Sequence, residues 1–324
     1  MFTVTSMQRP TLQDVAKLAG VSHMTVSRVV RGTLTVSPST REKVNRAIAE
    51  SGYKPDPVLS SLAAYRSKGS GHGNLLAFLD RDGTEYSSKV LDGVMREGSL
   101  LGYRTERFSL PRNPSHQKKL TRSLFHRGVR GLLFGPSDSP WQFEDWDWDE
   151  FAMVSLGALS HEPPMHAVAM DYFDGAAQGC RMLQRSGCQR PALIIEPALE
   201  DRTGGRWLGG YCSQRIVIGK GLVYRESPAD ASVLKKWLHQ ERVDGILTIH
   251  CEVCTIAQTA GIRTVLLNDF ARFKNVPYYS LSPGQIGAEG VRLLHYLLLR
   301  HEYGLPPEPK IVALRGSWVF PEKP

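Results

Sequence analysis

The residues best suited to specific chemistry lie close together near the N-terminus, where hydroxyl, imidazole and guanidinium side chains are interleaved with apolar ones. An arginine can donate two parallel hydrogen bonds to a guanine in the DNA major groove, and hydroxyl groups commonly bind phosphate oxygens. The segment from 22 to 28 combines these types in Ser22, His23, Met24, Thr25, Ser27 and Arg28. The pattern therefore predicts contacts to DNA.

A pair of cysteines later in the chain has the spacing of a metal or redox site. Cys251 directly follows His250, and Cys254 stands three positions further on. No second pair of cysteines or histidines accompanies them, as a structural zinc site would require. Packed thiols are therefore the favoured interpretation, and we expect no metal site.

Three tryptophans, Trp141, Trp146 and Trp148, stand among acidic residues and could stack on a sugar. Half-buried rings that cap a surface helix are the commoner arrangement for such a cluster. The sequence has neither a glycine-rich phosphate loop nor a serine nucleophile turn. We therefore expect no enzyme activity, no catalytic residues and no cofactor.

Short helices are expected to position the N-terminal side chains. Thr11 and Asp14 have the spacing of a capping box before a first helix over 12–19, and Gly20 supplies its left-handed stop. Ser22 is placed to cap a second helix. The first two helices are thus joined by a tight turn that contains a glycine.

A third helix completes the predicted N-terminal module. The second helix is expected to end near Gly32, and Ser37 followed by Pro38 opens the third, which stops at Gly52. Two helices across a tight turn with a third closing the core form a helix-turn-helix, whose second helix enters the major groove.

Net charge is concentrated at the same end of the chain. Residues 1–68 contain 10 Lys and Arg against 4 Asp and Glu, which gives +6 of the total of +8. A basic segment beside a nearly neutral remainder indicates a polyanionic partner for that segment.

The N-terminal sequence closely resembles the lactose-repressor (LacI) family over about 66 residues. The most specific matches are DVAKLAGVS at 14–22, TVSRV at 25–29, STREKV at 39–44 and GYKP at 52–55. The resemblance implies that His23 and Met24 select the operator. The candidate DNA-binding residues are Thr11, Leu12, Ser22, His23, Met24, Thr25, Ser27, Arg28, Arg31, Ser37, Tyr53 and Leu62.

The resemblance also implies a hinge helix after the DNA-binding domain, which we assign to residues 1–55. Asp56 and Pro57 can begin a short helix within the hinge and linker, 56–73, but so short a helix needs DNA and a partner to form. In the family, the residue at the position of Leu62 wedges into the minor groove. Leu59 is bulkier than the usual residue, and both leucines could instead dock on the rest of the protein.

The remaining chain, 74–324, alternates strand-like apolar runs with helical segments, which is typical of parallel α/β folds. The runs are 75–79, 132–134, 153–156, 192–195, 245–249 and 264–267. Similar helix-to-strand passages at 129–133 and 243–247 indicate two similar halves. The fold class is therefore an all-α helix-turn-helix head plus a two-lobed parallel-sheet body.

This body resembles the periplasmic-binding-protein-like effector domain of the same family. By that resemblance the first lobe is about 74–170 plus 284–320, and the second is about 171–283. The family's effector-binding positions fall on Arg206, His250 and Asp269. An arginine and a carboxylate can grip adjacent groups of a hydroxyl-rich ligand. Alternatively, Arg206 and Asp269 form an ion pair that closes the cleft.

These features together predict a transcription regulator that acts as a repressor. It is expected to bind a palindromic operator on double-stranded DNA as a homodimer, and a small-molecule effector is expected to control this binding. The alternative is a small-molecule-binding protein with no DNA-regulatory role. Met1 to Gln8 lacks the pattern of a secretory signal, and no apolar run is long enough to span a membrane. We therefore expect a cytoplasmic protein.

Overall fold

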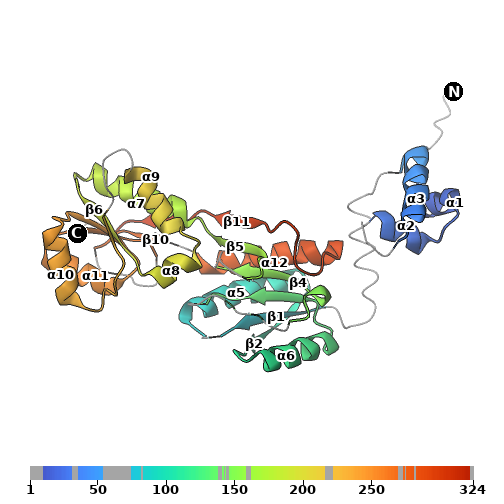
Figure 1. The fold of residues 1–324 in the computed structure, drawn as a ribbon, viewed down its shortest axis with the longest axis horizontal. Helices are drawn as coiled ribbons and strands as arrows, with labels where there is room; N and C mark the ends of the chain where they lie inside the picture. The colour runs from blue at the N-terminus through green and yellow to red at the C-terminus, as the bar shows by residue number, and fades with distance from the viewer. Residues whose placement is uncertain are drawn as a thin grey trace. The chain divides into compact units, whose positions relative to one another are not determined.

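The structure is a computed structural model that describes residues 10–30, 36–53, 74–81, 83–137, 141, 143, 146–157, 162–215, 222–268, 273, 275–280 and 282–321. The chain divides into two units, residues 1–70 and residues 71–324, which are called the head and the body here. Figure 1 shows the elements of both units. Each unit is described by itself.

The described part of the head consists of the helices α1 (Leu12–Ala19), α2 (His23–Val30) and α3 (Pro38–Ser51). Gly20 and Gly52 follow α1 and α3 with φ of 64° and 66°, the left-handed conformation that ends a helix. The helices share a small core of buried side chains: Val15, Ala16, Val26, Val29, Val44 and Ala47. The predicted helix-turn-helix is therefore confirmed, with its first and third helices at the expected positions.

The first lobe of the body is built on a parallel sheet with the strand order β11-β5-β4-β3-β1-β2. Its strands and helices are β1 (Leu75–Asp80), α5 (Glu85–Leu100), β2 (Arg104–Ser109), α6 (Pro114–His126), β3 (Gly131–Phe134), the 3-10 helix η1 (Trp148–Glu150), β4 (Ala152–Leu156), β5 (His166–Met170), α12 (Pro283–Arg300) and β11 (Ile311–Leu314). Helices α5 and α12 cover one face of the sheet, and α6 lies on the other (Figure 1).

The second lobe repeats this design around a sheet with the order β12-β10-β9-β8-β6-β7. Its elements are α7 (Tyr172–Arg185), β6 (Pro191–Ile194), α8 (Pro197–Arg202), α9 (Arg206–Arg215), β7 (Leu222–Tyr224), α10 (Ala231–Gln240), β8 (Gly245–Thr248), α11 (Cys251–Thr259), β9 (Arg263–Leu266), β10 (Tyr278–Ser280) and β12 (Ser317–Val319). Helices α7 and α9 pack on one face, and α10 and α11 pack on the other.

The internal similarity expected from the sequence has a structural basis. Gly131 and Gly245 begin β3 and β8, which occupy equivalent positions in the two sheet orders. A Cβ atom on Gly131 would lie 2.8 Å from a methyl carbon of Leu76, and one on Gly245 would lie 3.0 Å from the sulfur of Cys188. A side chain at either position would therefore force neighbouring core side chains to shift.

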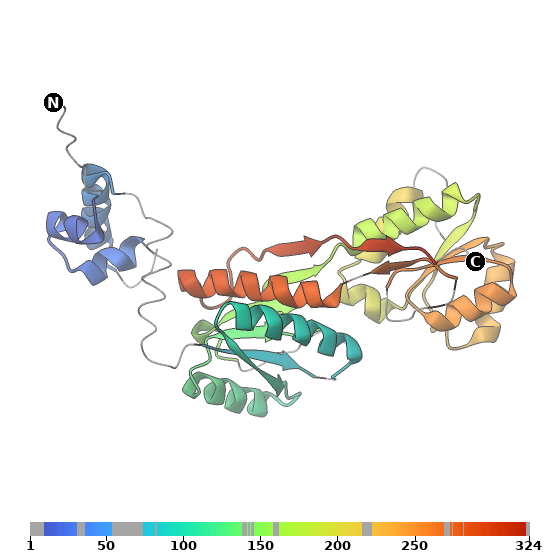
Figure 2. The same cartoon turned by 180° about the vertical axis from the view of Figure 1, so that it is seen from behind.

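The C-terminal strand differs from the expectation. The resemblance placed 284–320 in the first lobe, but the end of that segment forms two strands, which lie in different sheets (Figure 2). β11 pairs with β5 in the first sheet, whereas β12 pairs antiparallel with β10 in the second. Residues 317–319 therefore belong to the second sheet, because the chain crosses back between the lobes at Arg315 and Gly316.

No helix among the described ranges is both long and apolar enough to cross a membrane.

Candidate nucleic-acid interface and effector site

The N-terminal end of α2 presents the side chains that the sequence assigns to base recognition. His23 and Met24 are exposed, and Met24 is 65% exposed despite being apolar. The Ser22 hydroxyl oxygen accepts a hydrogen bond from the Thr25 backbone N–H at 3.1 Å and lies 2.9 Å from the Thr25 hydroxyl. This cap fixes the start of the helix and keeps its first turn open to a partner.

The other two helices of the head begin with similar caps. Asp14 Oδ2 accepts hydrogen bonds from Thr11 N at 2.9 Å and Thr11 Oγ1 at 2.7 Å, and Asp14 N donates to Thr11 Oγ1 at 3.3 Å. These bonds hold the pKa of Asp14 below its usual range. Thr40 N donates to Ser37 Oγ at 3.3 Å, so Ser37 caps α3 as expected.

The remaining candidates for DNA contact fall into three groups. Leu12 and Tyr53 are partly buried against the core of the head, so they also stabilise its fold. Ser27 and Arg28 belong to α2, whereas Arg31 and Leu62 lie outside the described residues, as does the whole predicted hinge, 56–73.

In the body, the predicted effector residue His250 lies just beyond the carboxyl end of β8. Its backbone N–H donates to Thr248 Oγ1 at 3.1 Å, and its Nδ1 lies 3.5 Å from Glu252 Oε1. Its Nε2 is buried and has no hydrogen-bond partner in the described part of the chain. A buried polar atom without a partner is rare in folded proteins, so this nitrogen is a candidate for a hydrogen bond that a bound ligand would complete.

Asn268 has the same property at the end of the neighbouring strand, β9. Its Nδ2 donates to the carbonyl oxygen of Ile249 at 2.9 Å, which joins the ends of β8 and β9. Its Oδ1 is buried and accepts no hydrogen bond from the residues described. The sequence analysis missed Asn268, although it directly precedes the predicted Asp269. Asp269 itself lies outside the described residues.

Arg206 is the first residue of α9 and is half-buried. The start of this helix is held by Glu200, whose Oε1 accepts a hydrogen bond from Leu208 N at 2.8 Å. The other carboxylate oxygen, Oε2, is buried and lacks a partner within the described ranges, and burial raises the pKa of Glu200. The sequence gave no local signal for Glu200.

The first lobe also has a charged group at the carboxyl ends of its strands. Asp80, at the end of β1, is buried and accepts two hydrogen bonds from Arg107, from Nε at 3.1 Å and Nη2 at 2.7 Å. The Ser87 hydroxyl donates to the same carboxylate at 2.7 Å. The sequence analysis missed this group, because Asp80 and Arg107 meet only through the pairing of β1 with β2.

The cysteines have the properties of packed thiols. Cys254 is buried, and burial raises the pKa of its thiol to about 12, which opposes formation of a reactive thiolate. The residues that the structure describes contain no group of three or more His, Cys, Asp or Glu that could hold a metal ion.

Comparisons with known proteins identify the class of both units. The family model "Bacterial regulatory proteins, lacI family" matches residues 11–56. The sucrose operon repressor of Streptococcus mutans serotype c is 28% identical over 246 residues, which cover 72% of this chain and 72% of that protein. The lactose operon repressor of Escherichia coli K12 is 31% identical over 196 residues, which cover 59% of this chain and 52% of that protein.

Solved structures share the fold at low sequence identity. The lac repressor dimer bound to operator and the anti-inducer ONPF has a TM-score of 0.59 and 21% identity, covering 96% of this chain and 98% of that chain. The complex of the transcriptional regulator CelR with cellobiose has a TM-score of 0.57 and 22% identity over the same shares of the two chains. The predicted fold class is therefore confirmed.

A helix-turn-helix head joined to a periplasmic-binding-protein-like body defines a DNA-binding transcription regulator with an effector-binding domain. By the match of residues 11–56, the head belongs to the LacI family of bacterial regulatory proteins, and the whole chain is similar to regulators of that family. Members of this family are not enzymes, which agrees with the expectation from the sequence. Membership also excludes the alternative of a binding protein with no DNA-regulatory role.

Proposed function

We propose that this regulator is a repressor that binds a palindromic operator as a homodimer and responds to a sugar or related metabolite held between the two lobes. Two relatives are named as repressors of sucrose and lactose operons, and the lac repressor was solved as a dimer on its operator. A dimer with two-fold symmetry matches an inverted repeat in the DNA. The proposal retains a DNA-binding domain over 1–55, a hinge and linker over 56–73 and an effector domain over 74–324.

The observation that carries the DNA side of the proposal is the exposed first turn of α2. Met24 is apolar but exposed, and it does not contribute to the core of the head, which other residues form. Its exposure is therefore explained better by contact with a partner than by folding. Together with His23, Met24 is placed to contact base edges, and Arg28 is the candidate for a guanine. Thr11, Ser22 and Ser37 sit at helix N-termini, where phosphate groups bind favourably.

Selection of bound sequences from a random DNA pool, followed by mobility-shift titration, tests this side. We expect enrichment of an inverted repeat and a steep loss of affinity with added salt. Arg28→Ala should weaken operator binding by about 1 to 3 kcal/mol and relax the choice of one base pair per half-site. Lys235→Ala, on an exposed position of α10, is the matched control. Selection that yields no inverted repeat would contradict the proposal.

Leu62 is proposed to wedge into the minor groove at the centre of the operator. Leu62→Ala should then reduce DNA bending and affinity on the operator while weak binding to unrelated DNA is retained, because base steps are unstacked only at the specific site. Equal losses on both DNAs would instead assign Leu62 to packing against protein.

The effector side rests on the unpartnered polar atoms at the carboxyl ends of β8 and β9. In open α/β sheets, ligands bind beyond the carboxyl ends of the strands. His250 Nε2 and Asn268 Oδ1 lack partners there among the described residues, and Arg206 and Asp269 are the proposed gripping pair. A hydroxyl-rich ligand can both donate to and accept from such groups.

Thermal melting in the presence of sucrose, lactose and cellobiose tests the effector side. A ligand that binds the folded state raises the melting temperature. Arg206→Ala and Asp269→Ala should fold and bind the operator but lose this response. If both variants respond as the wild type does, the two residues form a cleft-closing ion pair or have no role in binding.

A further inference from the structure

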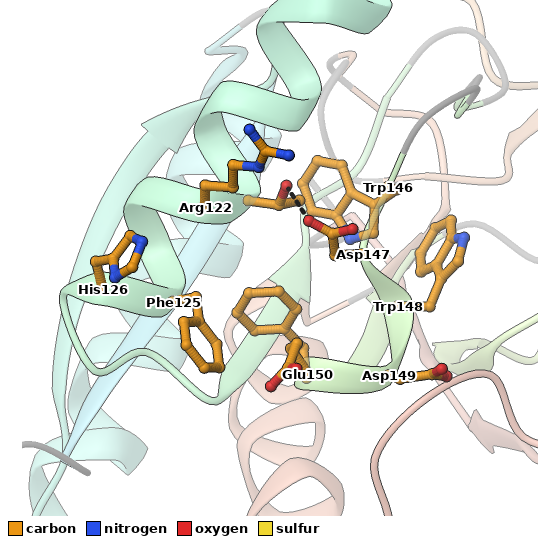
Figure 3. A pocket seen from close by; sticks show the side chains of 10 residues that line it. Arg122, Phe125, His126, Trp146, Asp147, Trp148, Asp149 and Glu150 are labelled. Carbon is orange, nitrogen blue, oxygen red and sulfur yellow. Dashed lines mark hydrogen bonds between the residues drawn. The ribbon is translucent and has the colours of Figure 1, made fainter.

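A cavity of ≈ 530 Å³ lies in the first lobe, where the end of α6 faces the segment 146–151 (Figure 3). Because this segment leads into β4 and α6 leads into β3, the cavity lies at the amino ends of these parallel strands. The proposed effector residues instead follow the carboxyl ends of strands in the second sheet. The cavity is therefore separate from that site.

Aromatic rings form one wall of the cavity. The ring centroids of Trp146 and Trp148 are 5.8 Å apart, and Phe143 lies 4.9 Å from Trp148 and 5.5 Å from Trp146. Phe134 of β3 supports Trp146 from the core at 5.9 Å. The sequence suggested half-buried rings, but Trp146 is only 6% exposed, while Trp148 keeps part of its surface in the cavity. Such interlocked rings provide a rigid platform for an apolar face.

The indole nitrogen of Trp146 is the feature that packing does not explain. Trp146 lines the cavity, and its Nε1 is buried without a hydrogen-bond partner in the part of the chain that the structure describes. A buried indole N–H normally finds an acceptor. A packed cap leaves this donor unsatisfied, and an oxygen of a ligand in the cavity would satisfy it once the indole ring shifts enough to expose the nitrogen.

Polar groups also line the cavity. Asp147, Asp149 and Glu150 contribute exposed carboxylates, and Arg122 of α6 lies on the side of Asp147 (Figure 3). The Thr121 hydroxyl lies 3.4 Å from Asp147 Oδ2 and holds that side chain at the cavity. The carboxylates can accept from hydroxyl groups, and the guanidinium can donate to them.

This combination discriminates between two ligand classes. An organic cation would suit the aromatic rings and the acids, but it offers no acceptor to Trp146 Nε1 or to Arg122. A polyhydroxylated ring offers an apolar face to Trp148, donors to the carboxylates and acceptors to the indole and guanidinium groups. We propose that this cavity is a second small-molecule site, which binds a carbohydrate ring independently of the effector site.

Binding of methyl β-D-glucopyranoside, sucrose, lactose and cellobiose to the full-length protein tests the proposal, with tetramethylammonium as the cationic probe. Saturation-transfer NMR detects binding, and calorimetry gives the Kd. Trp148→Leu should raise the Kd of the bound sugar about tenfold or more by removing the stacking face. Trp146→Phe, which removes the donor together with part of a buried ring, should raise it by roughly three- to tenfold, and the melting temperature of the ligand-free variant measures the accompanying loss of packing.

Two matched variants make the result decisive. Trp237→Leu removes a half-buried tryptophan of α10 in the second lobe and should leave this binding unchanged. All measurements are repeated with Arg206→Ala, which removes the proposed effector response but should leave the first-lobe site intact. Three outcomes would overturn the proposal. Sugar binding could be lost in Arg206→Ala but retained in Trp148→Leu and Trp146→Phe, the protein could bind tetramethylammonium instead of sugars, or it could bind none of the sugars.

Discussion

The polar groups assigned to binding differ between the head and the body in their exposure and their hydrogen bonding. In the head, the hydroxyls of Thr11, Ser22 and Ser37 are exposed and already bonded to the first turns of their own helices. In the body, His250 Nε2 and Asn268 Oδ1 are buried and have no partner among the described residues.

The difference follows from the size of what each unit binds. DNA is a large polyanion that is read from outside, so the head needs a preformed, exposed surface whose helix ends are already stable. A small molecule is enclosed, so its site contains buried groups whose hydrogen bonds the ligand completes. Stability and recognition are thus coupled in the head and separated in the body.

The largest expected effect tests whether the two units are independent. Val44 is fully buried in the core of the head, and a core this small rarely supplies more than about 5 kcal/mol. Val44→Asp buries an unpaired carboxylate, which costs more than such a core can offset. We expect the head to unfold, with loss of operator binding in mobility-shift assays and rapid cleavage of residues 10–53 by protease.

The body of the same variant should keep its melting transition and its response to an effector. Val233→Asp, at an exposed position of α10, is the control and should alter neither unit. A Val44→Asp protein in which the body also unfolds would show that the units are coupled, contrary to the comparison.

The next effect separates the two kinds of polar group. Ser37→Ala removes a helix cap and should lower the free energy of unfolding of the head by about 1 kcal/mol. His250→Phe removes the unpartnered Nε2 and also Nδ1, which lies 3.5 Å from the half-exposed Glu252, so the melting temperature of the body should fall only slightly. Its response to an effector should nevertheless disappear. Calorimetric melts with and without ligand measure both outcomes, and a large destabilisation by His250→Phe would contradict our account.

Much of the architecture follows from local sequence. Thr11, Gly20, Ser37 and Gly52 mark the ends of α1 and α3, because capping depends on one residue and its neighbours. The six predicted apolar runs all contain strands, since central strands of parallel sheets are buried on both faces. The edge strand β2 was missed, because its residues alternate between exposed and partly buried ones.

The site in the body depends on topology and was predicted less completely. His250 could be proposed through the family resemblance, but Asn268 and Glu200 become notable only when burial removes their access to water. Asp80 and Arg107 are brought together by strand pairing across 27 positions. No local pattern indicates such contacts.

The smallest expected effects concern pH, and they have opposite signs in the two units. Thr11 holds the pKa of Asp14 below its usual range, so the capping box contributes fully above the unfolded pKa of 3.8 and is lost as the pH falls through the folded pKa. Burial raises the pKa of Glu200 above 4.5, so the folded body binds more protons than the unfolded chain between the two pKa values. The stability of the body therefore falls as the pH rises through that window.

Two isosteric substitutions measure these contributions separately. Asp14→Asn should weaken the head at neutral pH and reduce its additional loss of stability in acid. Glu200→Gln keeps an oxygen that can accept from Leu208 N but carries no charge, so it should stabilise the body at neutral pH and flatten its pH dependence above 4.5. Denaturant unfolding followed across the acid range, with tryptophan fluorescence for the body and protease cleavage within residues 10–53 for the head, distinguishes the two. If Glu200→Gln lowers stability at neutral pH, the carboxylate is instead held in its charged form by the start of α9, and the contrast between the units would not extend to this residue.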